Sequence, residues 1–237
     1  MLNFAIADWQ AWAPFADNQA SWQRWAAGEA LEPISDKPAL SWVNPMLRRR
    51  LSFLSRLMLQ VAKPLAERQA IDAWVFASRH GELQTTVQLL VDIAKQEPLS
   101  PMAFSLSVHN TGAGLFSIAS GTQAPMNAIA AGRDTFVMAL TDAVARVKSS
   151  RAERVAVVYA EELLPERYAD YQQGEAPALA LGVVVDRSAV QWRVNREAGE
   201  AIDSSPAEAM LKALLGADRE PHFPAERGVW RLRRAGT

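Results

Sequence analysis

The sequence predicts an α/β fold, built as one mixed five-stranded sheet with helices on both of its faces. Short apolar runs of strand length, at 73–77, 154–159 and 178–185, alternate with longer stretches whose apolar residues recur at helical spacing. This alternation is typical of layered α/β proteins with a largely parallel sheet. A further run at 190–194 predicts a hairpin with the run before it, which makes the sheet mixed. We expect one domain over residues 1–237, with a C-terminal helix and tail from about residue 200.

The composition is that of an ordinary globular protein, because 49% of the 237 residues are hydrophobic and 22% are charged. A formal net charge of -1 gives no electrostatic argument for binding nucleic acid or an anionic membrane, and no nucleic-acid-binding motif is present. The absence of cysteine excludes disulfides, thiolate metal sites and a cysteine nucleophile. We see no signal peptide and no apolar run of about 18 residues, so we expect a cytoplasmic protein that does not enter the membrane.

The first part of the chain predicts a buried strand at 2–8 and then a loop rich in tryptophan. The four tryptophans between residues 9 and 25 could form an aromatic binding face, but pinning a loop and a short helix to the core is the commoner role. An Asn–Pro pair at 44–45 opens a helix, which we expect to run to about residue 63. Pro64 is expected to kink or restart that helix.

The strand at 73–77 leads into the turn Arg79–Glu82, which is followed by a helix expected to run from Glu82 to Lys95. His80 and Glu82 have two interpretations. They are either a structural histidine and an acid at a helix N-terminus, or parts of a binding site. The residue types and their spacing alone favour the structural interpretation.

The central stretch from Ser105 to Phe136 is poor in charge and rich in small residues. It predicts a helix at 113–119, a turn, a short apolar run at 124–131, and a helix that begins near Asp134 and runs to about residue 148. A strand that ends in a tight glycine turn and enters a helix is typical of a nucleophile elbow or an anion site, because the first helical N–H groups are unpaired. Arg133 occupies the nucleophile position, and arginine cannot act as a nucleophile.

Local signals also predict the C-terminal elements. Ser205 and Glu208 have the spacing of a capping box ahead of a helix that Gly216 ends. The alternating tail at 229–233 predicts a strand that adds to an edge of the sheet.

Several kinds of site are excluded or weakly indicated by the motifs. The three histidines are scattered and give no metal-ligand spacing, and Gly112–Gly114 is too short for a dinucleotide fingerprint, so we expect no metal and no cofactor. A hydrolytic triad that uses Ser107 or Ser120 with a histidine stays open, although neither serine has the G-x-S-x-G context.

The central stretch resembles the β-ketoacyl synthases of the thiolase-like superfamily. The matching pattern begins with SVHN at 107–110 and continues through a helix of small residues and a turn to Pro125. It ends in AIAAGRDTF at 128–136. Asn110, Gly114 and Gly121 match the family, Ala124 replaces a glycine, and the family's cysteine position falls on Arg133. The resemblance covers roughly residues 4–193 and is strongest with short ketosynthase-like N-terminal domains.

The resemblance implies one half of a thiolase-like fold. The family's second half, which supplies two histidines and a lysine to the condensation chemistry, has no counterpart here. It therefore implies a subunit with no catalytic residue that pairs with a full-length ketosynthase, as chain-length factors do, and meets acyl carrier protein through that complex. Aryl polyene-type fatty acid or polyketide biosynthesis is the implied setting. The alternative is a stand-alone acyl-binding protein, acyltransferase or hydrolase with an uncommon nucleophile.

Two sets of site residues follow from the resemblance. The first set is expected to line an acyl tunnel and limit chain length: Arg79, His80, Gly81, Glu82 and Phe116. The second set is a strand expected to pair with its counterpart across the dimer axis: Pro125, Met126, Asn127, Ala128, Ile129 and Ala130.

Overall fold

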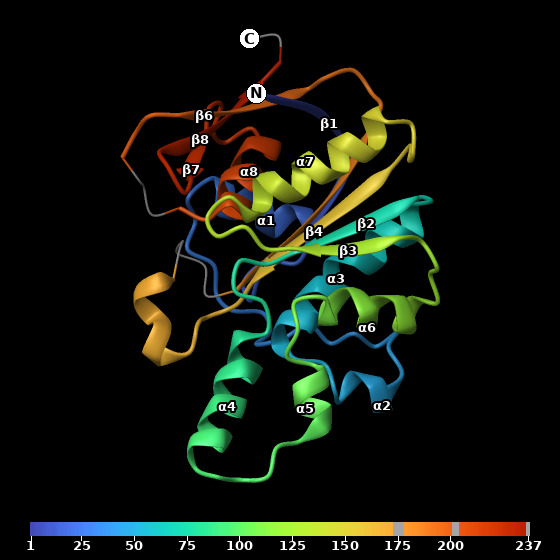
Figure 1. Ribbon diagram of the computed structural model, residues 1–237. Helices are drawn as coiled ribbons and strands as arrows, with labels where there is room; N and C mark the ends of the chain where they lie inside the picture. The colour runs from blue at the N-terminus through green and yellow to red at the C-terminus, as the bar shows by residue number, and fades with distance from the viewer. Residues whose placement is uncertain (173–177, 201–203, 236–237) are drawn as a thin grey trace.

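The computed structural model describes residues 1–172, 178–200 and 204–235 (Figure 1). The strands are β1 (Leu2–Trp12), β2 (Ala73–Ala77), β3 (Met126–Ile129), β4 (Val155–Glu161), β5 (Leu179–Asp186), β6 (Trp192–Glu197), β7 (His222–Pro224) and β8 (Val229–Arg234). The helices are α1 (Gln19–Ala26), α2 (Pro45–Arg48), α3 (Phe53–Arg68), α4 (Leu83–Ala94), α5 (Pro101–Ser105), α6 (Thr111–Ser120), α7 (Thr135–Lys148) and α8 (Pro206–Leu214), with a 3-10 helix at Glu166–Tyr171.

All of these strands join one sheet, in the order β3-β2-β4-β5-β1-β6-β8-β7. β2 pairs in parallel with β3 and β4, and the other pairings are antiparallel. The sheet is mixed, as the sequence predicts, but the expectation of five strands is wrong because it has eight. The difference lies at the β6-β8-β7 end, where short strands from the last part of the chain extend the sheet.

The expected hairpin between β5 and β6 is also wrong, because β1 lies between them. β1 is 11 residues long and divides its pairing: Leu2–Phe4 pair with β6, and Ala5–Trp12 pair with β5. The register shifts between Ile6 and Asp8, as at a β-bulge. The tail strand β8 pairs with both β6 and β7, so it is not the edge.

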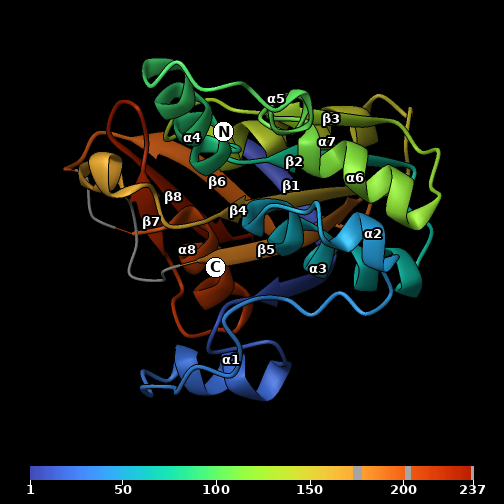
Figure 2. The same ribbon diagram turned by 90° about the horizontal axis from the view of Figure 1, so that it is seen from below.

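Helices cover both faces of the sheet, which confirms that part of the expectation (Figures 1 and 2). On one face, α3 and α6 pack on the sheet through a core that includes Leu57, Val61 and Phe116. On the other face, α7 and α8 form a second core with Phe136 and Leu140.

The tryptophan-rich segment has the structural role that is commoner for such loops. Trp12 and Trp22 are buried, and Trp22 packs edge-to-face on Phe15 and Trp25, which holds α1 against the molecule.

Two helical segments differ from the sequence expectation. The single helix expected from residue 46 is divided into α2 and α3, because the Ser52 side chain accepts a hydrogen bond from the Ser55 N–H and begins a new helix. Pro64 lies inside α3 without ending it. A proline in a helix interior costs about 3 kcal/mol, and the burial of α3 against the sheet offsets that cost. The short helix α5, capped by Ser100, has no counterpart among the elements expected from the sequence.

The last part of the chain covers α7. The capping box of Ser205 and Glu208 begins α8 as predicted, and Gly216 follows its end with φ 74°. Met210 of α8, Phe223 of β7 and Leu232 of β8 belong to the same core as α7. Phe223 packs edge-to-face on Phe136 of α7, which joins the C-terminal strands to this helix.

Candidate functional site

The carboxyl ends of β2 and β4 meet at one edge of the sheet and bring two charged turns together. The Glu161 carboxylate at the end of β4 accepts hydrogen bonds from the Arg79 backbone N–H and, at 3.3 Å, from the Ser78 hydroxyl. The Ser78 hydroxyl in turn accepts the Gly81 N–H at 2.9 Å. Ligands of open α/β sheets bind at this edge, beyond the carboxyl ends of the strands.

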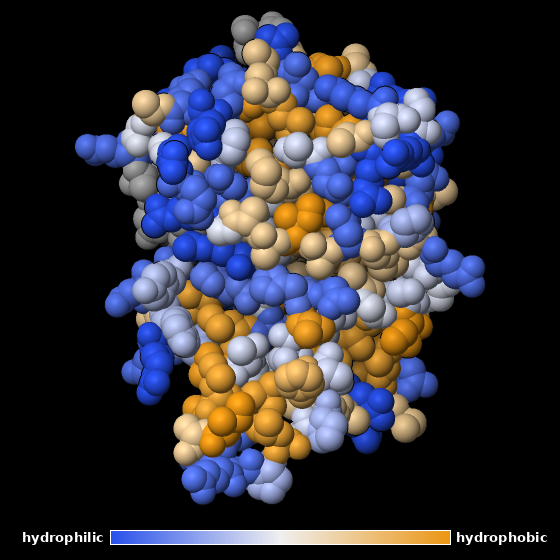
Figure 3. Space-filling view, in the orientation of Figure 1, coloured by the Kyte–Doolittle hydropathy of each residue, from blue (hydrophilic) through white to orange (hydrophobic). Residues whose placement is uncertain are grey.

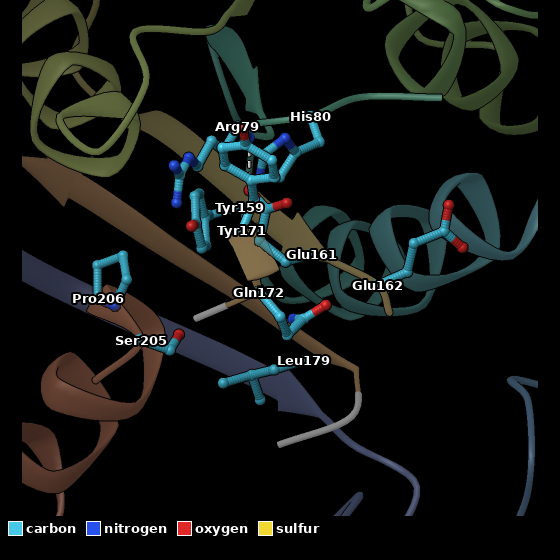
Figure 4. A pocket seen from close by; sticks show the side chains of 10 residues that line it. All are labelled: Arg79, His80, Tyr159, Glu161, Glu162, Tyr171, Gln172, Leu179, Ser205 and Pro206. Carbon is cyan, nitrogen blue, oxygen red and sulfur yellow. Dashed lines mark hydrogen bonds between the residues drawn. The ribbon is translucent and has the colours of Figure 1, made fainter. Parts of the chain in front are cut away.

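A small pocket lies among these turns (Figure 4). Its volume of about 30 Å³ holds water rather than an acyl chain. Its lining comes from the β2 turn, β4, the 3-10 helix and the start of α8: Arg79, His80, Tyr159, Glu161, Glu162, Tyr171, Gln172, Leu179, Ser205 and Pro206. This pocket is therefore too small to hold an acyl chain by itself.

His80 is half-buried and lines this pocket. Burial, followed by the nearby charges of Arg79 and His109, lowers the pKa of His80 to about 4, so the ring is neutral at pH 7. The His109 ring lies directly against Gly81: a Cβ added at Gly81 would be 2.8 Å from His109 Cε1. Gly81 also has φ 58°, a conformation that other residues rarely adopt.

Glu82 does not cap α4 through its side chain, as an acid at a helix N-terminus would. It is 3% exposed, and its Oε1 atom accepts hydrogen bonds from the hydroxyls of Ser52 and Ser55, both at 2.8 Å. Its Oε2 atom is buried without a hydrogen-bond partner in the part of the chain that the structure describes. Burial raises the pKa of Glu82 above its usual value. This carboxyl group fastens the start of α4 to the start of α3.

Glu161 and Glu162 complete a group of three neighbouring carboxyls. Burial raises the pKa of Glu161 to about 7, against the hydrogen bonds from Arg79, Tyr159 and Ser78. Burial and the charges of Glu82 and Glu161 raise the pKa of Glu162 to about 8. Sequence reasoning missed this pair, since two adjacent glutamates after a strand give no sign that they are buried.

This group predicts that the protein loses stability as the pH rises. Above about pH 4.5 the unfolded chain has released the protons of Glu161 and Glu162, whereas the folded protein retains them up to about pH 7 and pH 8, respectively. The free energy of unfolding is therefore expected to fall between pH 5 and pH 8. Glu162→Gln is expected to recover on the order of 4 kcal/mol at pH 8, because the pKa of Glu162 rises from 4.5 to about 8 and each pKa unit corresponds to about 1.4 kcal/mol. Urea unfolding at both pH values measures this, with the exposed Glu166→Gln as control. Equal pH dependence in the two variants would contradict the prediction.

Phe116 lies apart from the other residues expected to line a tunnel. It is fully buried on α6, with its ring centroid 4.8 Å from that of Trp74 and 5.8 Å from that of Phe76. It belongs to the core between α6 and the sheet and does not line the pocket of Figure 4. The structure thus brings the Arg79–Glu82 turn together with Glu161 and Glu162. Phe116 lies instead in the core between α6 and the sheet.

The elbow predicted from the sequence is present between β3 and α7. Gly132 makes the turn with φ 56°, and the Arg133 backbone N–H points to Glu226, whose Oε1 atom accepts it at 2.7 Å. Asp134 Oδ1 accepts hydrogen bonds from Trp230 Nε1 at 2.7 Å and from the Glu226 N–H at 3.1 Å. The Glu226 carboxylate, in the C-terminal part of the chain, thus accepts the hydrogen bond of the backbone N–H at the elbow. No sequence motif links Glu226 to a turn so far away in the chain.

The serine-based alternative finds no support in this geometry. The Ser107 hydroxyl donates to the carbonyl of Phe104 at 2.8 Å, and the Ser120 hydroxyl donates to the carbonyl of Phe116 at 2.7 Å. Both hydroxyls are therefore bonded to the preceding turn of backbone rather than to a histidine.

Two other features are absent from the part of the chain that the structure describes. In the described ranges, no group of three histidine or acidic side chains could hold a metal ion. Across the same ranges, no helix has both the length and the apolar character needed to span a bilayer.

Comparison with known families decides the family. Residues 22–231 match the model of the β-ketoacyl synthase N-terminal domain. The chain belongs to this family. No curated protein matches this ketoacyl synthase domain.

Two of the matching solved structures align over nearly the full length of both chains. One is a chain from the ketosynthase ApeO in complex with its chain length factor ApeC from Xenorhabdus doucetiae, with 26% identity, a TM-score of 0.83, and coverage of 99% of this chain and 100% of that chain. The other is a chain of the ishigamide ketosynthase/chain length factor, with 16% identity, a TM-score of 0.70 and the same coverage of 99% and 100%.

A longer ketosynthase shows how much of the fold this domain represents. The ketosynthase from module 6 of the bacillaene synthase of Bacillus subtilis has 12% identity and a TM-score of 0.58, and the match covers 91% of this chain but 46% of that one. At that identity the match shows the fold alone. The thiolase-like resemblance read from the central stretch is thereby confirmed, and this ketoacyl synthase domain corresponds to about half of such an enzyme.

Proposed function

We propose that this chain is a non-catalytic, chain-length-factor-like subunit, which pairs with a full-length ketosynthase and shapes its acyl tunnel. The observation that carries the proposal is the match, over the full length of both chains, to a chain from a complex of a ketosynthase with its chain length factor. Aryl polyene-type biosynthesis, with substrates delivered on acyl carrier protein, is the setting that we infer for the complex.

The elbow supports a non-catalytic role. A condensing enzyme needs a nucleophile to hold the acyl group and donors to stabilise the oxyanion. Here Arg133 occupies the nucleophile position, and its backbone N–H donates to the carboxylate of Glu226. The position thus lacks a nucleophile, and its amide donor is already bonded.

The free edge of the sheet supports pairing with another chain. β3 is an edge strand, and the four residues from Met126 to Ile129 are all half-buried. The carbonyls of Pro125 and Ile129 accept hydrogen bonds from β2 and the residue after it. Because successive residues direct their backbone groups to opposite sides, Ala128 directs its N–H and C=O to the open edge. Uncovered edges of this kind invite pairing with another strand.

The test is co-expression with the ketosynthase encoded nearest to this chain, followed by sizing of the complex and analysis of its products. We expect a stable 1:1 complex whose products differ in length from those of the ketosynthase alone. Separate elution of the two proteins, together with unchanged products, would overturn the proposal.

The turn after β2 is expected to help set product length in that complex. A tunnel wall selects by steric exclusion, so a smaller side chain removes a clash with longer acyl chains. His80→Ala is expected to lengthen the products by at least one extension unit, or to broaden their distribution, with little loss of turnover. Mass spectrometry of the products measures this, with the exposed Gln88→Ala on α4 as control. An unchanged product profile in the reconstituted complex would remove His80 from the tunnel wall.

A further inference from the structure

Helices α4 and α5 form an arm that packs weakly on the rest of the molecule (Figure 1). Among the described elements, α5 is the one with which α4 makes substantial contact. Only Leu89 of α4 is buried, and no residue of α5 is. An arm of this kind buries little apolar surface in the core. The residues on its surface therefore indicate what else it contacts.

The surface of the arm is apolar. Leu90 and Ile93 of α4 are 54% and 55% exposed, and Phe104 of α5 is 65% exposed. Figure 3 shows hydrophobic residues gathered over the end of the molecule where α4 and α5 lie. The exposed apolar side chains of the arm and its loops are Leu90, Val91, Ile93, Leu99, Met102, Phe104 and Val108. Contiguous exposed apolar surface of this kind marks a site of interaction on a protein.

The arm adjoins, and through α5 includes, a long segment of the chain without charged residues. Between Glu97 and Arg133 the chain contains no Asp, Glu, Lys or Arg, and this segment includes α5, α6 and β3. Figure 2 shows α4, α5 and β3 along one side of the molecule, with α1 on the opposite side. The open edge of the sheet and the apolar arm thus face the same direction. Depletion of charge is the compositional mark of the core of a protein–protein interface.

We propose that the apolar face of α4 and α5 is a second contact surface for the ketosynthase partner, continuous with the β3 edge. This inference rests on the proposed function and adds the part of the chain that supplies apolar burial to the pairing. β3 contributes only four residues, whereas each large side chain of the arm contributes roughly 1.5–3 kcal/mol when fully buried.

A protein fits this surface better than a lipid bilayer. Helices that lie on membranes place lysine and arginine beside their apolar face. α4 and α5 contain neither residue type, and Lys95 is the one basic side chain between Leu83 and Gly132 apart from histidine. The arm therefore lacks the cations that anionic lipid would attract.

The test compares two variants of the arm with a control variant elsewhere on the surface. The double variant Leu90→Ser/Ile93→Ser and the single variant Phe104→Ser remove apolar surface from the arm. The control Ile34→Ser/Val190→Ser removes exposed apolar side chains that are 52% and 44% exposed elsewhere. Because all these side chains are exposed, we expect unchanged circular dichroism and thermal unfolding. Titration with the ketosynthase should show Kd at least tenfold higher for the arm variants and within twofold of the parent for the control.

The outcomes separate this inference from the proposed function. If the unsubstituted chain binds the ketosynthase and the arm variants bind equally well, the arm is not a contact surface although the proposed function stands. If the unsubstituted chain does not bind at all, both fail. Weakened self-association of the chain with unchanged affinity for the ketosynthase would assign the arm to a second copy. Binding of the parent, but not the arm variants, to phosphatidylcholine–phosphatidylglycerol vesicles with unchanged ketosynthase affinity would assign it to a membrane. Each of these results overturns the inference.

Discussion

Replacing Ala128 by lysine is expected to abolish co-purification with the ketosynthase. Ala128 lies in the middle of the edge strand β3 and directs its backbone N–H and C=O away from β2. A strand paired across an interface would bury the added ammonium group without a partner, which costs about 3–5 kcal/mol. That cost corresponds to a roughly 100- to 4,000-fold loss of affinity, at about 1.4 kcal/mol for each factor of ten. An obligate interface of roughly 2,000 Å² or more would be weakened enough to dissociate during purification.

Two further variants separate pairing from a general effect of charge. Ala128→Pro removes the outward N–H without adding charge and is expected to weaken the complex as well. The unpaired chain should still fold, because edge strands tolerate a proline whose nitrogen faces solvent. His222→Lys places the same charge on β7, the other edge of the sheet, and should leave binding intact. Normal yields of complex from Ala128→Lys would show that the interface lies elsewhere.

The purified chain alone is expected to make no β-ketoacyl product from acyl and malonyl carrier substrates. It contains no cysteine, and Arg133 occupies the elbow. Arginine stays protonated and cannot attack a thioester. Loss of one oxyanion donor alone costs about 100- to 1,000-fold in rate, and here the elbow amide donates to the Glu226 carboxylate. Product formation above the uncatalysed rate would end the non-catalytic interpretation.

Arg133→Cys is expected to remain inactive, because a carboxylate beside a new cysteine disfavours both the thiolate and the oxyanion. Arg133→Cys/Glu226→Gln removes that negative charge, and the cysteine should then react faster with iodoacetamide than in the single variant. Condensation should still be absent from the double variant, since residues 1–237 contain no match to the histidine and lysine motifs that serve acid–base chemistry in the family. Equal alkylation rates in the two variants would show that Glu226 does not control the elbow.

The sequence by itself determined the elements whose signals are local. The capping box of Ser205 and Glu208 begins α8, and the Gly132 turn joins β3 to α7 at the predicted place. Such features depend on hydrogen bonds between residues three or four positions apart, so a short window of sequence contains them. The family signature from Ser107 to Phe136 is equally local, and it placed Arg133 at the elbow.

Only the tertiary structure decided which strands are neighbours and which distant side chains meet. β1 separates β5 from β6, Glu226 reaches the amide of Arg133, and Glu82, Glu161 and Glu162 come together at the ends of two parallel strands. The physical reason is that pairing of strands and burial of charge depend on packing between residues far apart in the chain, which hydrophobic periodicity does not encode. A glutamate that follows a strand has the same local sequence whether its carboxyl is solvated or buried, and only its neighbours in space set its pKa.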